Sequence, residues 1–277
     1  MRTLLTASAL LLIIATMAHT QSVTKYVRYE ASGTTSYGIL DGDAIRELRG
    51  DLFANPQPTG RRLKLSDVHL LAPVAPSKVI AVGLNYKSHL GERAAAAYPG
   101  LFAKMPTSII PTETDIVIPT DAKNVHYEGE MVVVIGKRAK NVSRTEAKSY
   151  VFGVTVGDDV SERDWQKGDL QWFRAKGSDT FGPLGPAIAV GVNYDDLLLQ
   201  TRLNGEVVQS QRTSDLIFPV AEIVSYVSRY VTLLPGDVIY TGTPGTTRQI
   251  KAGDVVEIEL EGVGVLRNRV TQASAIP

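Results

Sequence analysis

The chain has 277 residues, of which 44% are hydrophobic, and this is enough for one large domain with a small appendage around a buried core. Its 29 Lys and Arg residues balance its 29 Asp and Glu residues, so no basic field attracts nucleic acid and no nucleic-acid partner is expected. The absence of cysteine excludes disulfides, thiolate nucleophiles and sulfur-ligated zinc. Any metal site must therefore use oxygen and imidazole ligands.

The first residues, "MRTLLTASALLLIIATMAHTQS", combine Arg2, an apolar run to about Ala18, and a small and polar end. This pattern predicts a signal peptide over residues 1–20, export to the periplasm or beyond, and no stable membrane span after cleavage. The alternatives are an uncleaved N-terminal anchor and a wrongly placed start codon, in which case the protein is cytoplasmic.

Short alternating runs follow the leader and are broken by Gly-Thr-Thr-Ser and Asp-Gly-Asp, which are turn residues between strands. We therefore predict a small β-rich N-terminal domain over residues 21–75. A stretch rich in Pro and Gly around Asn55–Ser77 predicts a linker. The second and larger domain is expected over residues 76–277.

The larger domain is predicted to consist mostly of strands. "MVVVI" and "YVFGVTVG" are continuously apolar, as in strands that are covered on both faces, and Asn204-Gly205 in "TRLNGEVVQ" indicates a hairpin. "FPVAEIVSYVSRYV" predicts an amphipathic helix, because its apolar residues form one stripe. No regular alternation of strand and helix is present. The pattern favours an α+β fold with a mixed or antiparallel sheet, and it argues against a Rossmann fold.

Two glutamates precede the apolar run in "HYEGEMVVVIG". Strand periodicity places Glu128 and Glu130 on one face, about 6–7 Å apart. A solvated strand end would explain the pair, but the apolar run indicates burial, where two carboxylates repel unless they are protonated or share a cation. A hard divalent ion such as Mg²⁺, Mn²⁺ or Ca²⁺ suits oxygen ligands.

A third carboxylate is available in "VTVGDDVSERDWQ" at the end of another apolar run. Asp158 and Asp159 point to opposite faces if the strand continues, so only one of them can reach the ion. Alternatively, the pair caps the helix predicted in "SERDWQ". Periodicity does not choose between these interpretations.

Other candidate residues are His89 with Glu92, Lys176 and Thr243. The His and Glu are three residues apart and would meet on one face of a helical turn as a general base, although a surface pair has the same spacing. Lys176 lies in a predicted loop, where it could hold an anionic group or be solvated. Thr243 belongs to the tight turn "YTGTPGT", which could present hydroxyl and amide groups to a ligand. Phosphate-binding loops, dinucleotide fingerprints, hydrolase elbows and zinc-protease helices are absent from the sequence.

Six segments between about Lys78 and Val270 resemble, in order, the fumarylacetoacetate hydrolase family: "VGLNYKSHLGE", "YEGEMVVVIGKRAKNV", "VFGVTVGDDVSERDWQ", "AKGSDTFGPLGP", "TRLNGEVVQSQRTSDLIFPVAEIVSYVS" and "LLPGDVIYTGTP". The resemblance implies a β-rich mixed sandwich or roll and a homodimer. It also implies a metal-dependent enzyme that acts on 2-keto or 2,4-diketo acids.

The resemblance also implies roles for particular residues. It makes Glu128, Glu130 and Asp159 the ligands of Mg²⁺, with Mn²⁺ or Ca²⁺ as alternatives, and so selects Asp159 over Asp158. It makes His89 and Glu92 a water-activating dyad and Lys176 a further catalytic residue. The substrate-binding residues that it implies are Arg163, Gln166 and Thr243. The predicted leader departs from the family, whose members mostly handle intracellular intermediates, and this puts the physiological substrate in question.

We therefore predict a divalent-metal-dependent hydrolase that cleaves a carbon–carbon bond in acylpyruvate or fumarylpyruvate compounds. The alternatives on the same site are a decarboxylase of oxaloacetate-type 2-oxo acids and a hydroxymuconate-type isomerase. An exported protein that binds keto acids without catalysis is a third alternative. Retention of both His89 and Glu92 favours an enzyme, since a binding protein needs no base.

Overall fold

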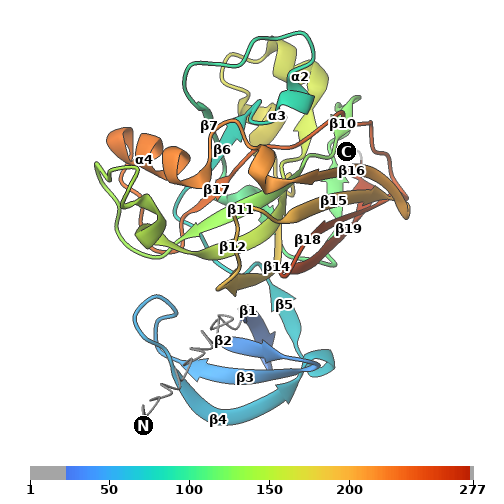
Figure 1. Ribbon diagram of the computed structural model, residues 1–277. Coiled ribbons are helices and arrows are strands. Elements are labelled where there is room, and N and C mark those ends of the chain that lie inside the picture. The colour runs from blue at the N-terminus through green and yellow to red at the C-terminus, as the bar shows by residue number, and fades with distance from the viewer. Residues whose placement is uncertain (1–22, 275–277) are drawn as a thin grey trace, which may run out of the picture.

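The computed structural model describes residues 23–274, so the predicted signal peptide lies outside the described residues. Its larger sheet has 12 strands in the order β4-β3-β2-β1-β14-β12-β11-β17-β6-β7, and β5 and β8 join it at β1 and β14 (Figure 1). The strands of this sheet are β1 (Thr24–Ala31), β2 (Thr34–Asp41), β3 (Ala44–Arg49), β4 (Gln57–Lys64), β5 (His69–Leu71), β6 (Val79–Gly83), β7 (Gly100–Lys104), β8 (Ile109–Ile110), β11 (Gly129–Ile135), β12 (Val151–Asp158), β14 (Gly182–Val190) and β17 (Val238–Tyr240).

A second sheet of five strands has the order β16-β15-β18-β19-β9, and β10 pairs with β13 in a short ladder. These strands are β9 (Ile116–Ile118), β10 (Val125–His126), β13 (Ser161–Glu162), β15 (Leu198–Leu203), β16 (Glu206–Arg212), β18 (Val255–Leu260) and β19 (Gly264–Gln272). The α-helices of the described residues are α1 (Lys87–Leu90), α2 (Arg163–Gly168), α3 (Phe173–Gly177) and α4 (Val220–Tyr230). Most strand pairs are antiparallel, but β6 with β17, β8 with β14 and β9 with β19 are parallel. The predicted α+β fold with a mixed sheet is confirmed.

The first five strands form a small unit below the main body (Figure 1). Strand β1 pairs with β14 from Thr24 and Val190 to Tyr26 and Ile188, so the unit continues the larger sheet. The linker predicted over residues 55–77 is wrong for Gln57–Lys64, which forms β4. This strand is the end of the sheet, where a proline costs no ladder hydrogen bond, and this is why a Pro- and Gly-rich sequence is tolerated there. The domain boundary at residue 75 stays a prediction.

Strand β11 is buried along its whole length, as predicted. Met131 and Val133 belong to the core that includes the five-stranded sheet and α4, whereas Val132 and Val134 belong to a second core on the opposite side of β11. Each buried side chain of this size contributes about 1.5–3 kcal/mol to stability. The strand is therefore held from both sides, and it gives a rigid support to the glutamates at its start.

Two further local predictions are confirmed. Asn204 and Gly205 connect β15 to β16 with φ values of 53° and 83°, which a two-residue hairpin turn of the primed type requires. Helix α4 buries the apolar stripe expected of it, Val220, Ile223, Val224 and Val227.

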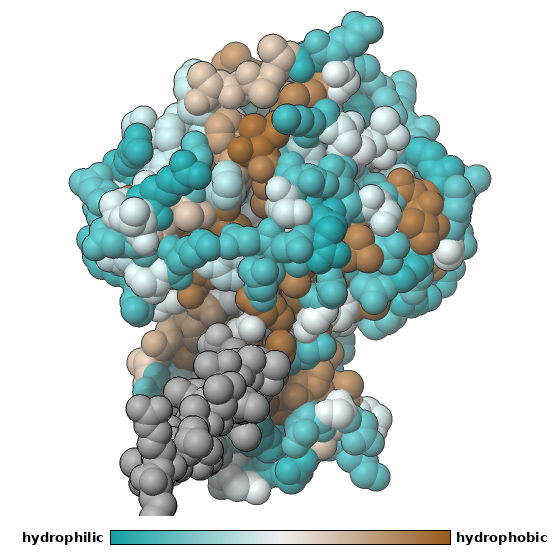
Figure 2. All heavy atoms as spheres, viewed as in Figure 1, coloured by the Kyte–Doolittle hydropathy of each residue, from teal (hydrophilic) through white to brown (hydrophobic). Residues whose placement is uncertain are grey.

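Most of the side chains on the viewed surface are hydrophilic, and the hydrophobic ones gather in separate patches (Figure 2). Among the exposed hydrophobic residues are Leu170 and Phe173, which flank Trp172 in the chain. None of the helices in residues 23–274 has the length and apolar character needed to cross a bilayer.

Candidate active site

Three buried carboxylates meet where β11 begins and β12 ends. Glu128 directly precedes β11, Glu130 is its second residue, and Asp159 directly follows β12. The two strands are antiparallel neighbours, and the backbone N–H of Asp159 donates to the carbonyl of Glu128 at 2.9 Å. One carboxylate oxygen from each side chain lies within 4.8 Å of the others. The structure thus brings together the three acidic residues that the family resemblance singled out.

Asp158 points elsewhere and does not join this group. Its Oδ1 accepts a hydrogen bond of 2.7 Å from the backbone N–H of Glu128, and its Oδ2 is buried without a hydrogen-bond partner among the described residues. Burial raises the pKa of Asp158 to about 7. Neither aspartate caps the following helix, because Glu162 accepts the N–H of Trp165 at 2.5 Å at the start of α2. The capping alternative is therefore wrong.

The charges of the three carboxylates are in conflict. Burial and the charges of Asp159 and Glu128 raise the pKa of Glu130 well above its usual range. Burial also opposes ionisation of Glu128, but the cationic Lys176 and Arg163 outweigh it and hold the pKa of Glu128 well below its usual range. The site offers three carboxylate oxygens in one buried volume, and the raised pKa of Glu130 favours its protonated form unless a cation is present. Such oxygen donors suit a hard divalent cation. The residues present fit such an ion.

Two buried lysines hold this acidic group from one side. Lys176 lies in α3 and not in a loop as predicted, and its Nζ is 2.6 Å from Glu128 Oε2 and 2.5 Å from Asp159 Oδ2. Burial alone would lower the pKa of Lys176, but Asp159 and Glu128 raise it, so its ammonium is charged. Lys104 ends β7, places its Nζ 2.7 Å from Asp159 Oδ1 and donates to the carbonyl of Lys176.

Sequence analysis missed Lys104. In "GLFAKMP" its position at the end of an alternating run is the one signal of burial, and a solvated lysine at a strand end produces the same pattern. Burial lowers the pKa of Lys104 against the opposing charge of Asp159. Its contact with Asp159 comes from a strand 55 residues away in sequence, which local pattern cannot reveal.

The predicted substrate-binding residues line the same cavity. Arg163 begins α2, and its Nη2 donates to Glu128 Oε1 at 2.5 Å and to Thr247 Oγ1 at 2.9 Å, while its Nη1 donates to Gln166 Oε1 at 2.9 Å. Thr243 accepts a 2.8 Å hydrogen bond from Gln209 Nε2. Thr247 was not identified from the sequence, although it follows the predicted tight turn.

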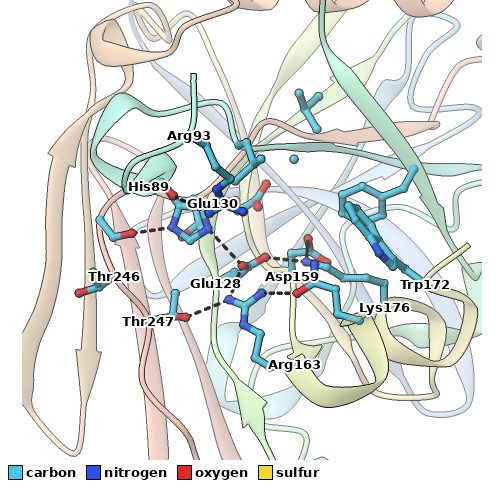
Figure 3. Close-up of a pocket in the computed structure, with 18 of the residues that line it drawn as sticks. His89, Arg93, Glu128, Glu130, Asp159, Arg163, Trp172, Lys176, Thr246 and Thr247 are labelled. Atoms are coloured by element: carbon cyan, nitrogen blue, oxygen red, sulfur yellow. Dashed lines mark hydrogen bonds and ion pairs between the residues drawn. The ribbon is translucent and has the colours of Figure 1, made fainter. Parts of the chain in front are cut away.

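His89 lies in α1 with its Nε2 3.6 Å from Glu128 Oε1 (Figure 3). Its Nδ1 is 2.5 Å from the carbonyl oxygen of Gly245. A carbonyl can only accept, so Nδ1 carries a hydrogen, and Nε2 is the ring nitrogen that faces Glu128 and the cavity. The structure thus fixes the orientation of the ring of a candidate base.

Glu92 does not contact His89 in this structure. Helix α1 ends at Leu90, and Gly91 turns the chain with a φ of 60°, so the helical spacing that the prediction assumed is interrupted. Glu92 is exposed, and no hydrogen bond or ion pair joins it to His89 within residues 23–274. The expectation that the two share a helical face is corrected, and the catalytic dyad stays a prediction.

The carboxylates face a cavity of about 630 Å³ (Figure 3). One wall is apolar: the rings of Phe102 and Trp172 meet edge to face with centroids 5.2 Å apart, and Lys176 Nζ lies 4.9 Å from the Phe102 ring. Leu84 and Trp172, both in the lining, have φ values of 58° and 55°, which are costly for bulky residues. An apolar wall lowers the local dielectric and strengthens the charge interactions beside it.

Comparison with known proteins identifies the family. Residues 78–271 match the family model described as fumarylacetoacetate (FAA) hydrolase, C-terminal, and residues 24–73 match the model described as Rv2993c-like, N-terminal. The first match covers more than half of the chain, so this protein belongs to the fumarylacetoacetate hydrolase family. The family and the fold predicted from the six sequence segments are both confirmed.

The relatives differ in activity. The chain is 43% identical to the oxaloacetate tautomerase Fahd2a, mitochondrial, of Rattus norvegicus, with 74% of this chain and 70% of the relative covered. It matches the 2-hydroxyhepta-2,4-diene-1,7-dioate isomerase of Mycobacterium marinum with a TM-score of 0.86 and 41% identity, covering 91% of this chain and 100% of that one. It matches the maleylpyruvate hydrolase of Sphingobium sp. SYK-6, solved with manganese(II) and pyruvate, with a TM-score of 0.76 and 27% identity, covering 90% and 100%. The family thus includes tautomerases, isomerases and hydrolases.

Proposed function

We propose that this protein is a divalent-metal-dependent enzyme that interconverts the keto and enol forms of a 2-keto acid. The observation that carries the proposal is His89, whose Nε2 faces the carboxylate group while the predicted partner Glu92 lies outside the cavity. Isomerisation needs one base and no attacking water. The names of the tautomerase and isomerase relatives, at 43% and 41% identity, support the same chemistry.

Glu128, Glu130 and Asp159 would hold Mg²⁺, Mn²⁺ or Ca²⁺. When bound, such an ion supplies positive charge that makes an adjacent ketone more acidic at its α-carbon. Arg163 and Gln166, which line the same cavity, would orient the substrate carboxylate.

His89 Nε2 accepts the proton from C3 of the substrate. The electrons of the C–H bond form the C2=C3 double bond, and negative charge develops on the C2 oxygen. The ammonium of Lys176 stabilises this charge, and the apolar wall strengthens that interaction by lowering the local dielectric. Return of the proton from the imidazolium to the oxygen completes the enol, so the base is regenerated and no water is consumed.

The hydrolysis of 2,4-diketo acids that the sequence predicted is the second candidate. The cavity of about 630 Å³ exceeds what a four-carbon acid fills, and this leaves room for an acyl group and a water molecule. The maleylpyruvate hydrolase relative supports this candidate. Hydrolysis would need His89 to activate water, with Glu92 brought to it as its partner.

The test uses oxaloacetate, whose enol form absorbs in the ultraviolet, and acetylpyruvate, each with Mn²⁺-loaded protein. We expect the wild type to accelerate conversion of the oxaloacetate enol, and His89→Gln to lose about 100-fold or more, since a general base contributes at least this factor. The matched variant Glu92→Gln should keep tautomerisation within about twofold. Loss of acetylpyruvate cleavage in Glu92→Gln would instead support the hydrolase.

Several outcomes would contradict the proposal. Full tautomerisation by His89→Gln would exclude the histidine as the base. Cleavage of acetylpyruvate without any acceleration of the oxaloacetate enol would make hydrolysis the function, and loss of carbon dioxide from oxaloacetate would make it decarboxylation. Binding of keto acids without turnover of any of them would indicate the binding protein considered above.

The assembly and location of the protein are proposed on the family resemblance and on the leader sequence. We infer a homodimer, which size-exclusion chromatography with light scattering would detect as twice the mass of the chain. Export is proposed from residues 1–20. Fractionation of the native host, with N-terminal sequencing of the recovered protein, would show either a cleaved exported chain or an intact cytoplasmic one.

A further inference from the structure

His126 lies behind the cavity and takes no part in the proposed reaction. It is half-buried in β10, two residues before Glu128. Its Nε2 lies 2.8 Å from Asn124 Oδ1, and its Nδ1 lies 2.9 Å from Thr247 Oγ1. Both ring nitrogens therefore have a polar partner, and one of these partners, Thr247, lines the cavity.

Each contact in this group has a defined donor. The amide nitrogen of Asn124 donates to Asp164 Oδ1 at 3.2 Å, so the amide oxygen faces His126 and accepts the hydrogen of Nε2. In the neutral ring Nδ1 then accepts the hydroxyl hydrogen of Thr247. A lone pair of Thr247 Oγ1 accepts from Nη2 of Arg163, which lies 2.9 Å away. His126 thus orients the hydroxyl that Arg163 contacts.

The backbone around β10 joins the two elements that these side chains connect. On one side β10 pairs with β13, and the carbonyl of Asn124 accepts the N–H of Arg163 at 2.9 Å, where α2 begins. On the other side the carbonyl of Val125 accepts the N–H of Ile250 at 2.8 Å. The loop that carries Thr247 and the helix that carries Arg163 are therefore held by the same short segment.

Arg163 depends on these contacts for its place in the cavity. Its Nη2 donates both to Thr247 Oγ1 and to Glu128 Oε1 (Figure 3). Glu128 is one of the proposed ligands of the divalent ion, and positive charges repel, so Glu128 holds Arg163 less strongly once the ion is bound. Thr247 is not a proposed ligand, and its contact with Arg163 is not weakened in this way. Support from Thr247 therefore matters most in the metal-loaded protein.

We propose that His126 is a positioning residue that acts through Thr247 to hold Arg163 where it binds the carboxylate of the substrate. This inference rests on the proposed function, in which Arg163 orients that carboxylate. Loss of an outer partner of a metal site typically costs about 10–100-fold in affinity or activity. We expect an effect of about tenfold, the lower end of this range, because Gln166 continues to hold the guanidinium.

The test measures the dissociation constant of pyruvate by calorimetry with the Mn²⁺-loaded full-length protein. Thr247→Val, which keeps the shape of the side chain, and His126→Phe, which keeps a planar ring, should each raise this constant about tenfold. Thr247→Ser retains the hydroxyl and should bind pyruvate as the wild type does. The control His69→Phe changes an exposed histidine of β5, outside the cavity lining, and should leave binding unchanged.

A double-mutant cycle shows whether the two residues act through Arg163. Arg163→Gln alone should weaken pyruvate binding at least about tenfold, since a hydrogen bond to a charged group contributes this much. Adding Thr247→Val or His126→Phe to Arg163→Gln should cause no further loss, because residues of one network are not additive. With oxaloacetate as substrate, the single variants Thr247→Val and His126→Phe should raise KM and leave kcat unchanged.

The contrary results can be told apart. A wild-type dissociation constant in Thr247→Val or in His126→Phe would overturn the inference and leave the proposed function intact. A full additional loss in the double variants would also overturn it, because Thr247 would then contact the substrate without Arg163.

Two further readouts complete the test. Mn²⁺ affinity should be unchanged in His126→Phe, and an equal loss of Mn²⁺ and pyruvate binding would mean that His126 supports Glu128 instead of Arg163. If His126→Phe does not fold, His126→Leu takes its place. Failure of pyruvate to bind to the wild type would overturn the proposed function together with the inference.

Discussion

At the scale of single residues, Glu130 shows how the site depends on a cation. Its Oε2 accepts the backbone N–H of Gly242 at 2.6 Å, and the nearby negative charges oppose its ionisation. Glu130→Gln keeps an oxygen for that hydrogen bond but removes the charged ligand. Loss of a residue that merely orients a ligand costs up to about 100-fold in metal affinity, so we expect at least this loss in a Mn²⁺ titration.

Two comparisons separate ligand loss from damage to the fold. Without metal, Glu130→Gln should unfold at a temperature no lower than the wild type, because it relieves repulsion among the carboxylates. Glu92→Gln makes the same chemical change at an exposed position outside the cavity and should bind Mn²⁺ normally. Unchanged Mn²⁺ affinity in Glu130→Gln would remove this residue from the site.

Lys104 gives a second prediction at this scale. Lys104→Met leaves Asp159 with one buried cationic partner, Lys176, in place of two. Removing one member of a buried ion pair costs about 3–5 kcal/mol, and because Lys176 remains we expect a loss of about 3 kcal/mol in stability. Added Mn²⁺ should raise the melting temperature of this variant more than that of the wild type, because the ion restores positive charge beside Asp159.

The control for Lys104 is Lys78→Met. Lys78 Nζ lies 2.7 Å from Asp237 Oδ2, a pair that does not involve the three carboxylates. Its loss should lower the melting temperature without any extra response to Mn²⁺. An equal Mn²⁺ response in both variants would mean that Lys104 contributes only to the stability of the fold and does not balance the charge of the carboxylates.

At the scale of elements, the site depends on how closely β11 approaches the second sheet. Gly129 separates the two glutamates, and a Cβ there would lie 2.1 Å from Thr201 Oγ1 and 3.2 Å from Ile258 Cγ2. Gly129→Ala must therefore push β11 away from β15 and β18. We expect a loss of about 1–3 kcal/mol in stability, and a loss of Mn²⁺ affinity although every ligand is retained.

Gly168→Ala is the matched control for this prediction, because a Cβ at the end of α2 meets no heavy atom within 4 Å. Thermal unfolding and Mn²⁺ titration of the two variants test the point together. Normal metal affinity in Gly129→Ala would show that the spacing of the strands does not position Glu128 and Glu130.

Sequence pattern predicted the elements that local chemistry determines. The buried run of β11, the turn at Asn204-Gly205 and the apolar stripe of α4 each follow from residues adjacent in the chain. The end of α1 was not predicted, because the turn at Gly91 overrides a His and Glu spacing that fits a helix. The strand β4 was missed for a related reason, since Pro and Gly forbid a central strand but not an edge strand.

The composition of the site could be predicted only in part. The two-residue repeat of a strand predicts that Glu128 and Glu130 share one face. The choice of Asp159 over Asp158 depends on where β12 ends, and it came from the family resemblance. Lys104 contacts Asp159 from the end of β7, and Arg93 lines the cavity from the turn after α1. Such long-range contacts are set by the order of strands in the sheet, which no single segment encodes.

At the scale of the whole molecule, the N-terminal unit has a small core of its own. The buried apolar residues of this core are Val27, Tyr29, Ile45 and Ala187, and Ala187 belongs to β14 of the main body. The cores around β11 are far larger. The unit thus draws its stability from few contacts. One side chain with a shifted pKa within it should therefore change the pH dependence of its unfolding measurably.

Tyr29 is that group. Its hydroxyl donates to Glu47 Oε1 at 3.2 Å, and burial together with the charge of Glu47 raises the pKa of Tyr29 from 10.0 to about 12. The folded state therefore keeps the phenol proton at a pH where the unfolded chain loses it. The stability that this group provides is fully present below pH 10 and is lost as the pH rises towards 12.

Tyr29→Phe removes both the hydrogen bond and this pH dependence. At pH 8 the wild type should be the more stable protein by about 1 kcal/mol, the usual value of one hydrogen bond. At pH 11 the advantage should shrink by about 1 kcal/mol, because the unfolded tyrosine is ionised one pH unit above its ordinary pKa. Calorimetric unfolding of both proteins at the two pH values measures the difference, in which the titration of all other groups cancels. An advantage of the same size at both pH values would show that the raised pKa of Tyr29 is not linked to folding of the unit.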